Sequence, residues 1–350
     1  VPLDAEFEET MTFCLNCRAC EAVCPSLVPF GRAMEGARAE IAAQRPRWSR
    51  KTRHWVLGRV LPSRRLMAVM TRLVNWARRL GLQGLVPRRY RAGMAGLRMV
   101  APATRPRLFP AANGLGRVGL LLGCVMEPWF GEVNRAAEAL LTMAGFEVIA
   151  PTSQTCCGAL AAHDGAMPAA VRLATINARA FEGFDLVVAT AAGCSAHLRD
   201  YDHFVEGTGV AAKSRDITQV VADLIESERL PRLPARQMRV AVQDPCHLRH
   251  AQRIMSAPRT VLSAAGYSIV EIDPDGICCG AAGIYSVLRP EASRELGRRK
   301  AAQVESSGAT LVASANPGCE IQLRSHLGPA YRVAHPVELY WDAVAADPNQ

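Results

Sequence analysis

The chain has 350 residues, 49% hydrophobic and 21% charged, with a formal net charge of +9, a composition typical of a globular protein with two or three domains. No stretch reaches the roughly 18 consecutive apolar residues of a membrane span, and the first residues do not form a signal peptide. We therefore expect a cytoplasmic protein. Because structural disulfides are rare in the cytosol, the twelve cysteines indicate another chemistry.

The first 45 residues contain a run of four cysteines with the spacing Cys-x-x-Cys-x-x-Cys-x-x-x-Cys-Pro: Cys14, Cys17, Cys20 and Cys24. This run is typical of bacterial ferredoxins, where it binds a [4Fe–4S] cluster. Zinc usually takes cysteines as two separated pairs, so a zinc site is the less favoured alternative. The fourth cysteine of such a run ligates a second cluster in two-cluster ferredoxins. Since one run is present, either a distant cysteine completes the first cluster or, as we favour, an N-terminal piece with the partner run is missing.

Residues 46–112 form a basic segment. Between Ile41 and Met126 there are 18 Lys and Arg but no Asp or Glu, so the rest of the chain is net acidic. Short apolar runs and scattered prolines predict two or three amphipathic helices followed by a loop. Tryptophans 48, 55 and 76 suit an interfacial helix on a membrane surface or an acidic partner. A solvated basic face is the alternative; no nucleic-acid-reading motif is present, so nucleic acid is not expected.

From about residue 113, short apolar strands alternate with helices. The first set has strands at 118–122, 146–149 and 186–189 and helices at 134–144 and 169–181. The second set has strands at 239–242, 268–272 and 311–314 and helices at 258–264 and 291–305. This alternation predicts parallel βαβ units. We expect an α/β fold with domains at 1–45, 46–112, 113–232 and 233–350.

The two sets are an internal repeat. A shift of 122 residues superimposes Cys124 on Cys246 and the Cys-Cys-Gly-Ala sequence at 156–159 on that at 278–281. After a three-residue insertion Cys194 meets Cys319, and each of these two follows a glycine. The repeat therefore matches eight cysteines in two groups: Cys124, Cys156, Cys157 and Cys194, and Cys246, Cys278, Cys279 and Cys319.

In each repeat the cysteines follow successive strands. Parallel strands end at one edge of their sheet, where ligand sites form, so we expect four thiols per repeat to converge. A metal cluster in each half, or one shared between the halves, is the favoured interpretation. A disulfide between Cys156 and Cys157 is the alternative, and a buried structural role would explain any single cysteine.

Two histidines and one glycine pattern need separate interpretation. We expect His197, three residues after Cys194, to be a solvated helix residue, with a cluster ligand as the alternative. His247, beside Cys246, suits tuning of a cluster by hydrogen bonds, although loop polarity also explains it. The sequence 114–119 fits G-x-G-x-x-G, but it precedes a strand rather than opening a helix. No flavin or nicotinamide site is therefore expected on this chain.

Taken together, the ferredoxin-type run, the basic linker and the two Cys…Cys-Cys-Gly…Gly-Cys repeats resemble the iron–sulfur subunits of glycolate oxidase over essentially the whole chain. The repeats are similar to the cysteine-rich domain that heterodisulfide reductases share with lactate-utilisation iron–sulfur proteins. Glycolate oxidase members carry two ferredoxin runs, and this chain matches only the second. The heterodisulfide reductase pattern ends each repeat in Cys-x-x-Cys, whereas His197 and Gln322 stand at those last positions here.

The resemblance implies a function in electron transfer. A separate FAD-containing subunit would oxidise glycolate or a related 2-hydroxy acid, and this chain would pass the electrons through [4Fe–4S] clusters to a quinone or similar acceptor at the membrane, without being catalytic alone. It also implies two Rossmann-like cysteine-rich repeats after a partial ferredoxin-like segment. The alternatives are a heterodisulfide-reductase-like or lactate-utilisation-type oxidoreductase, and a zinc-stabilised nucleic-acid-binding module.

Overall fold

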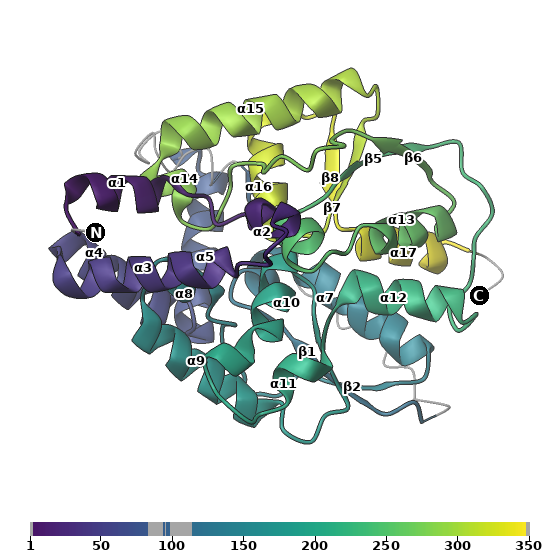
Figure 1. Cartoon of the computed structure of the whole chain (residues 1–350). Helices are drawn as coiled ribbons and strands as arrows, with labels where there is room; N and C mark the ends of the chain where they lie inside the picture. Colours follow the sequence, from purple (N-terminus) through teal and green to yellow (C-terminus); the bar gives the residue numbers. More distant parts are fainter. Residues whose placement is uncertain (1–2, 83–93, 95, 99–113, 348–350) are drawn as a thin grey trace.

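The computed structural model describes residues 3–82, 94, 96–98 and 114–347 (Figure 1). The N-terminal segment forms α1 (Ala5–Phe13), α2 (Ala19–Val23) and α3 (Phe30–Gln44). Asp4 begins α1 by accepting a hydrogen bond from the backbone N–H of Phe7 at 2.9 Å, which is a typical N-cap contact. Helix α3 packs against α1 on one side and reaches the first repeat at α8 (Ala159–His163).

The basic segment forms α4 (Trp48–Trp55), the π-helix η1 (Val56–Val60) and α5 (Arg64–Arg79). Ser63 caps α5 by accepting from the N–H of Leu66. Helix α5 packs against α7 of the first repeat. The predicted amphipathic helices are therefore present, whereas most of the loop predicted after them lies outside the described residues.

Each repeat contains one four-stranded parallel sheet, so the α/β prediction is confirmed. The first sheet has the order β2-β1-β3-β4, with β1 (Arg117–Leu121), β2 (Glu147–Ile149), β3 (Leu186–Ala189) and β4 (Ser214–Asp216). The second has the order β6-β5-β7-β8, with β5 (Arg239–Gln243), β6 (Ser268–Glu271), β7 (Leu311–Ser314) and β8 (Arg332–Ala334). The sequence analysis missed the edge strands β4 and β8, because three residues containing polar side chains give no strand signal.

Helices connect the strands within both repeats. Those of the first half are α7 (Met126–Met143), α8, α9 (Met167–Ala180), α10 (Ala192–Arg199), η3 (Tyr201–His203), α11 (Val210–Lys213) and α12 (Ile217–Glu226). Those of the second half are η4 (His247–Ala251), α13 (Ser256–Ala264), α14 (Tyr285–Leu288), α15 (Pro290–Ser306), α16 (Pro317–His326) and α17 (Pro336–Ala345). Helix α7 begins eight residues earlier than predicted, with a kink at Phe130.

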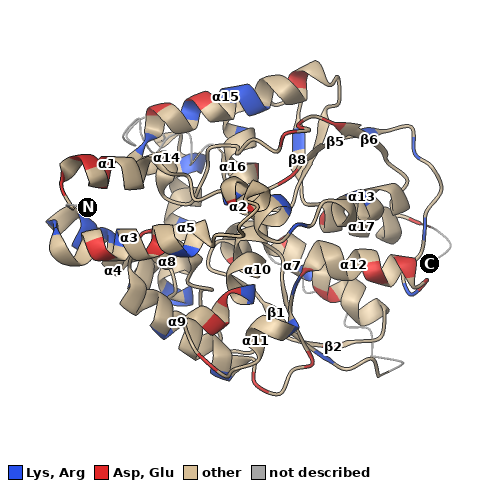
Figure 2. Cartoon of the chain, viewed as in Figure 1, with Lys and Arg blue, Asp and Glu red and all other residues tan. Residues whose placement is uncertain are grey.

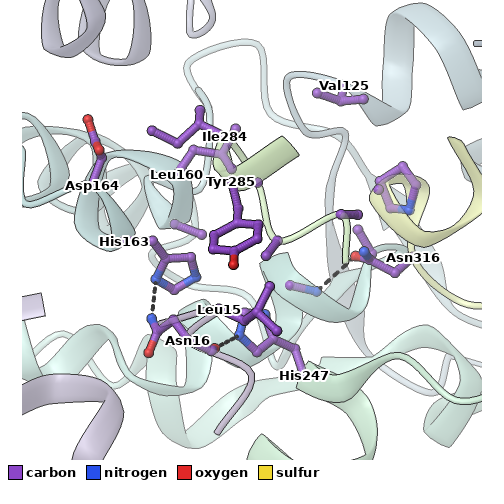
Figure 3. Close-up of a pocket in the computed structure, with 18 of the residues that line it drawn as sticks. Leu15, Asn16, Val125, Leu160, His163, Asp164, His247, Ile284, Tyr285 and Asn316 are labelled. Carbon is purple, nitrogen blue, oxygen red and sulfur yellow. Dashed lines mark hydrogen bonds between the residues drawn. The ribbon is translucent and has the colours of Figure 1, made fainter. Parts of the chain in front are cut away.

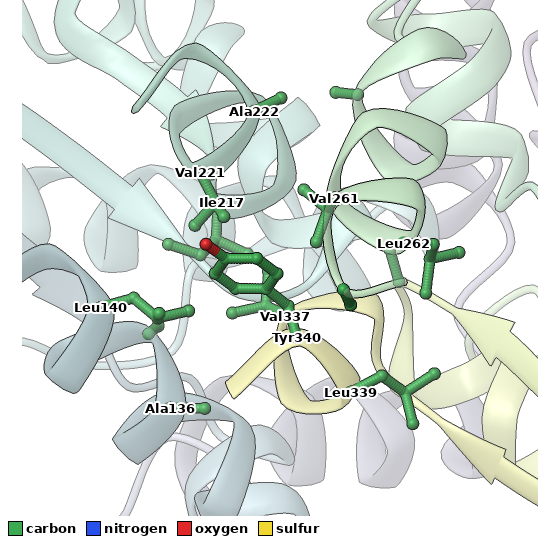
Figure 4. Close-up of a cluster of buried hydrophobic side chains, with 14 of the residues drawn as sticks. Ala136, Leu140, Ile217, Val221, Ala222, Val261, Leu262, Val337, Leu339 and Tyr340 are labelled. Atoms are coloured by element: carbon green, nitrogen blue, oxygen red, sulfur yellow. The ribbon is translucent and has the colours of Figure 1, made fainter. Parts of the chain in front are cut away.

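One hydrophobic core joins the two halves. Helices α7 and α12 of the first repeat pack against α13 and α17 of the second (Figure 4). Tyr340 is fully buried between Leu140, Val221 and Val261 in this cluster, and its hydroxyl donates to the carbonyl of Pro231 at 2.6 Å. Because this layer covers one side of each sheet, it fixes how the cysteine-bearing edges of the two halves meet.

Among the described residues, no helix is both long and apolar enough to cross a membrane.

Candidate metal centre

The cysteine-bearing edges of the two halves enclose one pocket of about 270 Å³. The N–H of Ala192, at the start of α10, donates to the carbonyl of Ala315, just after β7, at 3.0 Å. The N–H of Gly193 donates to Asn316 Oδ1 at 3.3 Å. Through these contacts the two edges face each other across the pocket. Nine cysteines line it: Cys14, Cys124, Cys156, Cys157, Cys194, Cys246, Cys278, Cys279 and Cys319.

The four thiols of the first repeat lie in two close pairs. Cys156 Sγ is 3.2 Å from Cys124 Sγ, and Cys157 Sγ is 3.3 Å from Cys194 Sγ. All twelve cysteines of the chain are free, so Cys156 and Cys157 do not form the disulfide considered as an alternative. The expected convergence of thiols behind the strand ends is therefore present.

The close thiols strongly affect one another's protonation. The hydrogen bond with Cys156 raises the pKa of Cys124, and the same contact lowers the pKa of Cys156. In the second half, the hydrogen bond with Cys278, together with burial, raises the pKa of Cys246. Metals bind the thiolate form. A bound cation is therefore needed to keep the whole set deprotonated in this buried place.

A glycine in the left-handed conformation follows each cysteine pair. Gly158 has φ 98° and Gly280 has φ 84°, values that side-chain-bearing residues rarely adopt. A Cβ atom at Gly280 would also lie 2.8 Å from both Leu296 Cβ and the carbonyl oxygen of Ser293. These glycines turn the chain sharply after each pair of cysteines that lines the pocket, and Gly158 also begins α8.

Two buried side chains hold the first cysteine pair in place. Asn177 Nδ2 donates to the carbonyl of Cys156 at 3.0 Å, and the Tyr201 hydroxyl donates to the carbonyl of Cys157 at 2.7 Å. Asn177 also donates to the Tyr201 hydroxyl at 3.0 Å. Both side chains are fully buried. The sequence analysis missed them because neither has a counterpart in the second repeat.

The second repeat supports its cysteines with different groups. The N–H of Gly280 donates to Cys278 Sγ at 3.4 Å, and Asn316 Nδ2 lies 3.5 Å from Cys319 Sγ. Ser293 Oγ donates to the carbonyl of Gly280 at 2.9 Å. Hydrogen bonds to ligand sulfurs are one of the means by which proteins set cluster potentials.

The ferredoxin-type run lies beside the second repeat. Asn16 and Arg18 have positive φ values of 53° and 62°, which curl the run, and the N–H of Asn16 donates to Cys14 Sγ at 3.3 Å. Burial raises the pKa of Cys17, with smaller contributions from Cys246 and Cys14. Cys17 is therefore close to the first cysteine of the second repeat, whereas Cys20 is exposed to solvent.

A polar network ties this run to both repeats (Figure 3). The carbonyl of Asn16 accepts from His247 Nε2 at 3.0 Å, and Asn16 Nδ2 lies 3.0 Å from His163 Nδ1. His163 Nδ1 also lies 2.6 Å from Glu35 Oε1 on α3. Burial raises the pKa of Glu35, but the hydrogen bond and charge of His163 outweigh burial and lower it. Sequence reasoning found His247 but missed Asn16, His163 and Glu35, which come together only in the fold.

One expectation about the histidines was wrong. His197 is 4% exposed rather than solvated, because α10 turns it into the first half toward Tyr201 and Phe204. Burial lowers its pKa to about 4. His247 is partly buried, and desolvation lowers its pKa to about 3. Both imidazoles are therefore neutral at physiological pH and act through hydrogen bonding and packing.

The pocket fits an iron–sulfur cluster better than a single ion. Among the described residues, no three His, Cys, Asp or Glu side chains are arranged to hold one metal ion. The three arginines of the pocket wall bond to oxygens rather than to thiols: Arg38 to the carbonyl of Cys14, Arg50 to Glu8, and Arg53 to Asp164. Iron would supply the positive charge that the buried thiolates need.

The glycine pattern at 114–119 does not have the context of a dinucleotide site. Gly114 and Gly116 precede β1, and Gly119 lies inside it. The fingerprint requires a strand before the glycines and a helix after them. The pattern therefore gives no support to nucleotide binding.

Comparisons with known proteins agree with this geometry. The cysteine-rich domain family matches residues 118–199 and 240–324, which contain the two cysteine groups. The probable glycolate oxidase iron–sulfur subunit of Bacillus subtilis (strain 168) is 33% identical over 97% of this chain and 84% of its own length. The glycolate oxidase iron–sulfur subunit of Escherichia coli (strain K12) is 28% identical over 96% of this chain and 83% of its own length.

A shorter relative covers part of the chain. Lactate utilization protein A of Oceanobacillus iheyensis is 28% identical over 64% of this chain and 96% of its own length. The two longer relatives, by contrast, span almost all of this chain, from the ferredoxin-type run through both cysteine-rich repeats. The chain belongs to the family of glycolate oxidase iron–sulfur subunits.

Proposed function

We propose that this chain is the iron–sulfur electron-transfer subunit of an oxidase or dehydrogenase acting on glycolate or a related 2-hydroxy acid. The observation that carries the proposal is the pocket in which the eight repeat thiols, five of them buried, face each other beside a ferredoxin-type run. Iron–sulfur clusters accept and donate single electrons at potentials set by their surroundings. A chain with several such sites suits electron transfer from a flavin subunit.

The cysteines divide into three proposed ligand groups. Cys14, Cys17, Cys20 and Cys24 bind [4Fe–4S] iron in the ferredoxin manner. The two repeat groups, each with its Cys-Cys pair, hold cluster iron in the shared pocket. Burial excludes water from both Cys-Cys pairs and from Cys319, while the contact between His247 and Asn16 keeps the ferredoxin run close to the second repeat. The chain thereby places its cluster sites side by side.

The exposed edge of the ferredoxin-type run is the proposed place of contact with the FAD-containing partner subunit. Cys20 is exposed there, and neighbouring Val23 and Leu27 are 81% and 69% exposed. Exposed apolar groups beside an exposed ligand suit docking at short distance from a cluster. In this proposal no flavin or nicotinamide binds to the chain itself, and the acceptor is a quinone or similar molecule at the cytoplasmic face of the membrane.

A heterodisulfide-reductase-like activity is less favoured. His197 and Gln322 occupy the places where that family has a fifth cysteine, and both side chains are buried within their own halves. Gln322 donates to the carbonyl of Ser293 at 2.8 Å, so it has a structural partner. Neither residue offers the additional thiolate.

The test is the metal content of the anaerobically purified chain. We expect iron matched by acid-labile sulfide, and an EPR signal that appears on reduction with dithionite. The isolated chain should not oxidise glycolate with a dye acceptor, and activity should appear when the flavoprotein subunit is added. Zinc without sulfide, or glycolate oxidation by the chain alone, would overturn the proposal.

A further inference from the structure

Helix α5 carries apolar side chains on two opposite faces. Its inner face packs against the first repeat: Met67 and Thr71 are buried, and Val74 contacts the cluster of α7 residues that includes Trp129 and Phe130. Its outer face remains exposed, with a stripe spaced as one side of a helix. The exposed fractions along it are 47% for Leu66, 50% for Val69, 44% for Met70, 59% for Leu73, 60% for Trp76 and 54% for Leu80. A helix that is apolar on both sides normally has a second apolar partner.

A row of arginines borders this exposed stripe. Arg65, Arg72 and Arg79 are seven residues apart, so they lie along one flank of the helix. Among the described residues none of the three forms an ion pair, whereas Arg50 and Arg53 of α4 bind Glu8 and Asp164. The flanking charge is therefore available to a negatively charged partner.

The surrounding sequence carries no negative charge. No Asp or Glu occurs between Ile41 and Met126, and in Figure 2 the acidic residues appear on other elements, among them α1, α12 and α15. Two further tryptophans on α4, Trp48 and Trp55, are 82% and 59% exposed. An apolar face with tryptophan, bordered by arginine, is the pattern of helices that lie in the interface of an anionic membrane.

We propose that the outer face of α5 binds the surface of an anionic lipid bilayer. The apolar stripe enters the boundary between headgroups and acyl chains, and the arginine row pairs with lipid phosphates at the same depth. A bilayer fits better than an acidic protein, because the stripe runs from Leu66 to Leu80 and is rich in large apolar side chains. The inference deepens the proposed function by naming the part of the chain that brings it to a membrane acceptor.

The experiment measures co-sedimentation of the full chain with vesicles. We expect binding to vesicles of equal parts phosphatidylcholine and phosphatidylglycerol, weak binding to phosphatidylcholine alone, and a loss of binding as salt rises. Replacing Arg65, Arg72 and Arg79 with Gln should lower partitioning on the order of 100-fold. The matched control replaces three exposed arginines of α15, Arg294, Arg298 and Arg299, with Gln, and should change it little.

A second pair of variants tests the apolar stripe. Leu73→Glu should reduce vesicle binding by at least roughly tenfold, while Met238→Glu, at a site of similar exposure before β5, should not. Iron and sulfide content, measured on every variant, reports on the proposed function separately from lipid binding. The proposal is wrong if the wild-type chain does not bind anionic vesicles, or if the triple Arg→Gln variant of α15 loses as much vesicle binding as that of α5. Loss of flavoprotein binding in Leu73→Glu without any vesicle binding would assign this face to a protein instead.

Discussion

The two cysteine-rich repeats share a topology and a cysteine pattern but not their surroundings. In the first half the backbone of the cysteine pair is held by Asn177 and Tyr201. In the second half Ser293 and Gln322 support the corresponding turn, and His247 links it to the ferredoxin-type run. Duplication therefore preserved the thiols while the side chains around them diverged. If each half holds its own cluster, as we propose, the two sites should differ in stability and potential.

Removing one cysteine from each half is expected to have the largest effect. Cys156→Ser and Cys278→Ser each delete one thiol of a buried group, and we expect each to abolish iron binding in its own half while the other half and the ferredoxin-type run stay loaded. Iron and sulfide per chain, together with EPR spectra of the reduced protein, measure this outcome. If either variant lost all repeat-bound iron, the two halves would share one cluster, and the comparison between separate sites would fail.

The ion pairs of the two halves differ as well. The buried Arg98 of the basic segment bridges Glu320 and Glu338 of the second half, with closest contacts of 2.6 Å to each. Although burial lowers the pKa of Arg98, the charges and hydrogen bonds of Glu320 and Glu338 together outweigh it and raise that pKa. In the first half Arg117 and Glu147 form an exposed pair at 3.3 Å.

Arg98→Met should therefore destabilise the chain by about 3–5 kcal/mol, because it removes the cation between two buried carboxylates and leaves Glu320 with Arg324 alone. Arg117→Met, the surface control, should cost about 0–1 kcal/mol. Urea unfolding of the two variants measures the difference. Equal losses of unfolding free energy would mean that the buried Arg98 bridge stabilises the chain no more than the exposed pair of Arg117 and Glu147.

The side chains that hold the two cysteine pairs in place are expected to differ less in their contribution to stability. Asn177→Ala removes donors to the carbonyl of Cys156 and to the Tyr201 hydroxyl, and should cost about 1–3 kcal/mol. Ser293→Ala removes the single donor to the carbonyl of Gly280 and should cost about 0.5–1.5 kcal/mol. Unfolding curves would show this order. A larger loss for Ser293→Ala would reverse our ranking of the two supports.

The same residues explain how far the sequence could predict the site. The cysteines, the strands before them and the glycines after them follow local rules, so the convergence of the thiols and the α/β fold were predictable. A shift of 122 residues places exposed Arg299 opposite Asn177 and half-exposed Val171 opposite Ser293. Because these supporting side chains have no counterpart in the other repeat, comparing the two repeats does not reveal them. Contacts such as Asn16 with His163, 147 residues apart, exist only after folding.

The smallest expected contrast concerns the residue that caps the N-terminus of the helix after the edge strand in each half. Asp216 caps α12 after β4, and His335 caps α17 after β8. Both side chains are buried. Burial raises the pKa of Asp216, and burial lowers the pKa of His335 to about 3. The same position therefore responds to pH with a carboxyl in one half and an imidazole in the other.

The sign of the pH effect follows from these shifts. Below its ordinary pKa of 6.5, His335 gains a proton in the unfolded chain but not in the folded one, so stability falls with pH from about 6.5 down to about 3. Between pH 7 and 5.5 the loss from this group is about 1 kcal/mol. Asp216 acts oppositely: its contribution is present below pH 3.8 and is lost as pH rises toward its raised folded pKa. Asp216 therefore adds no acid lability between pH 5.5 and 7.

His335→Asn keeps a capping side chain that cannot titrate, so its unfolding free energy should fall by about 1 kcal/mol less than that of the wild type between pH 7 and 5.5. Asp216→Asn serves as the matched change in the first half and should leave the acid slope of the wild type intact. Urea unfolding at the two pH values compares them. If the change in unfolding free energy between the two pH values were the same in His335→Asn as in the wild type, other histidines, such as His197 and His247, would dominate the response to acid. The two capping residues would then differ in chemistry but not in their effect on stability.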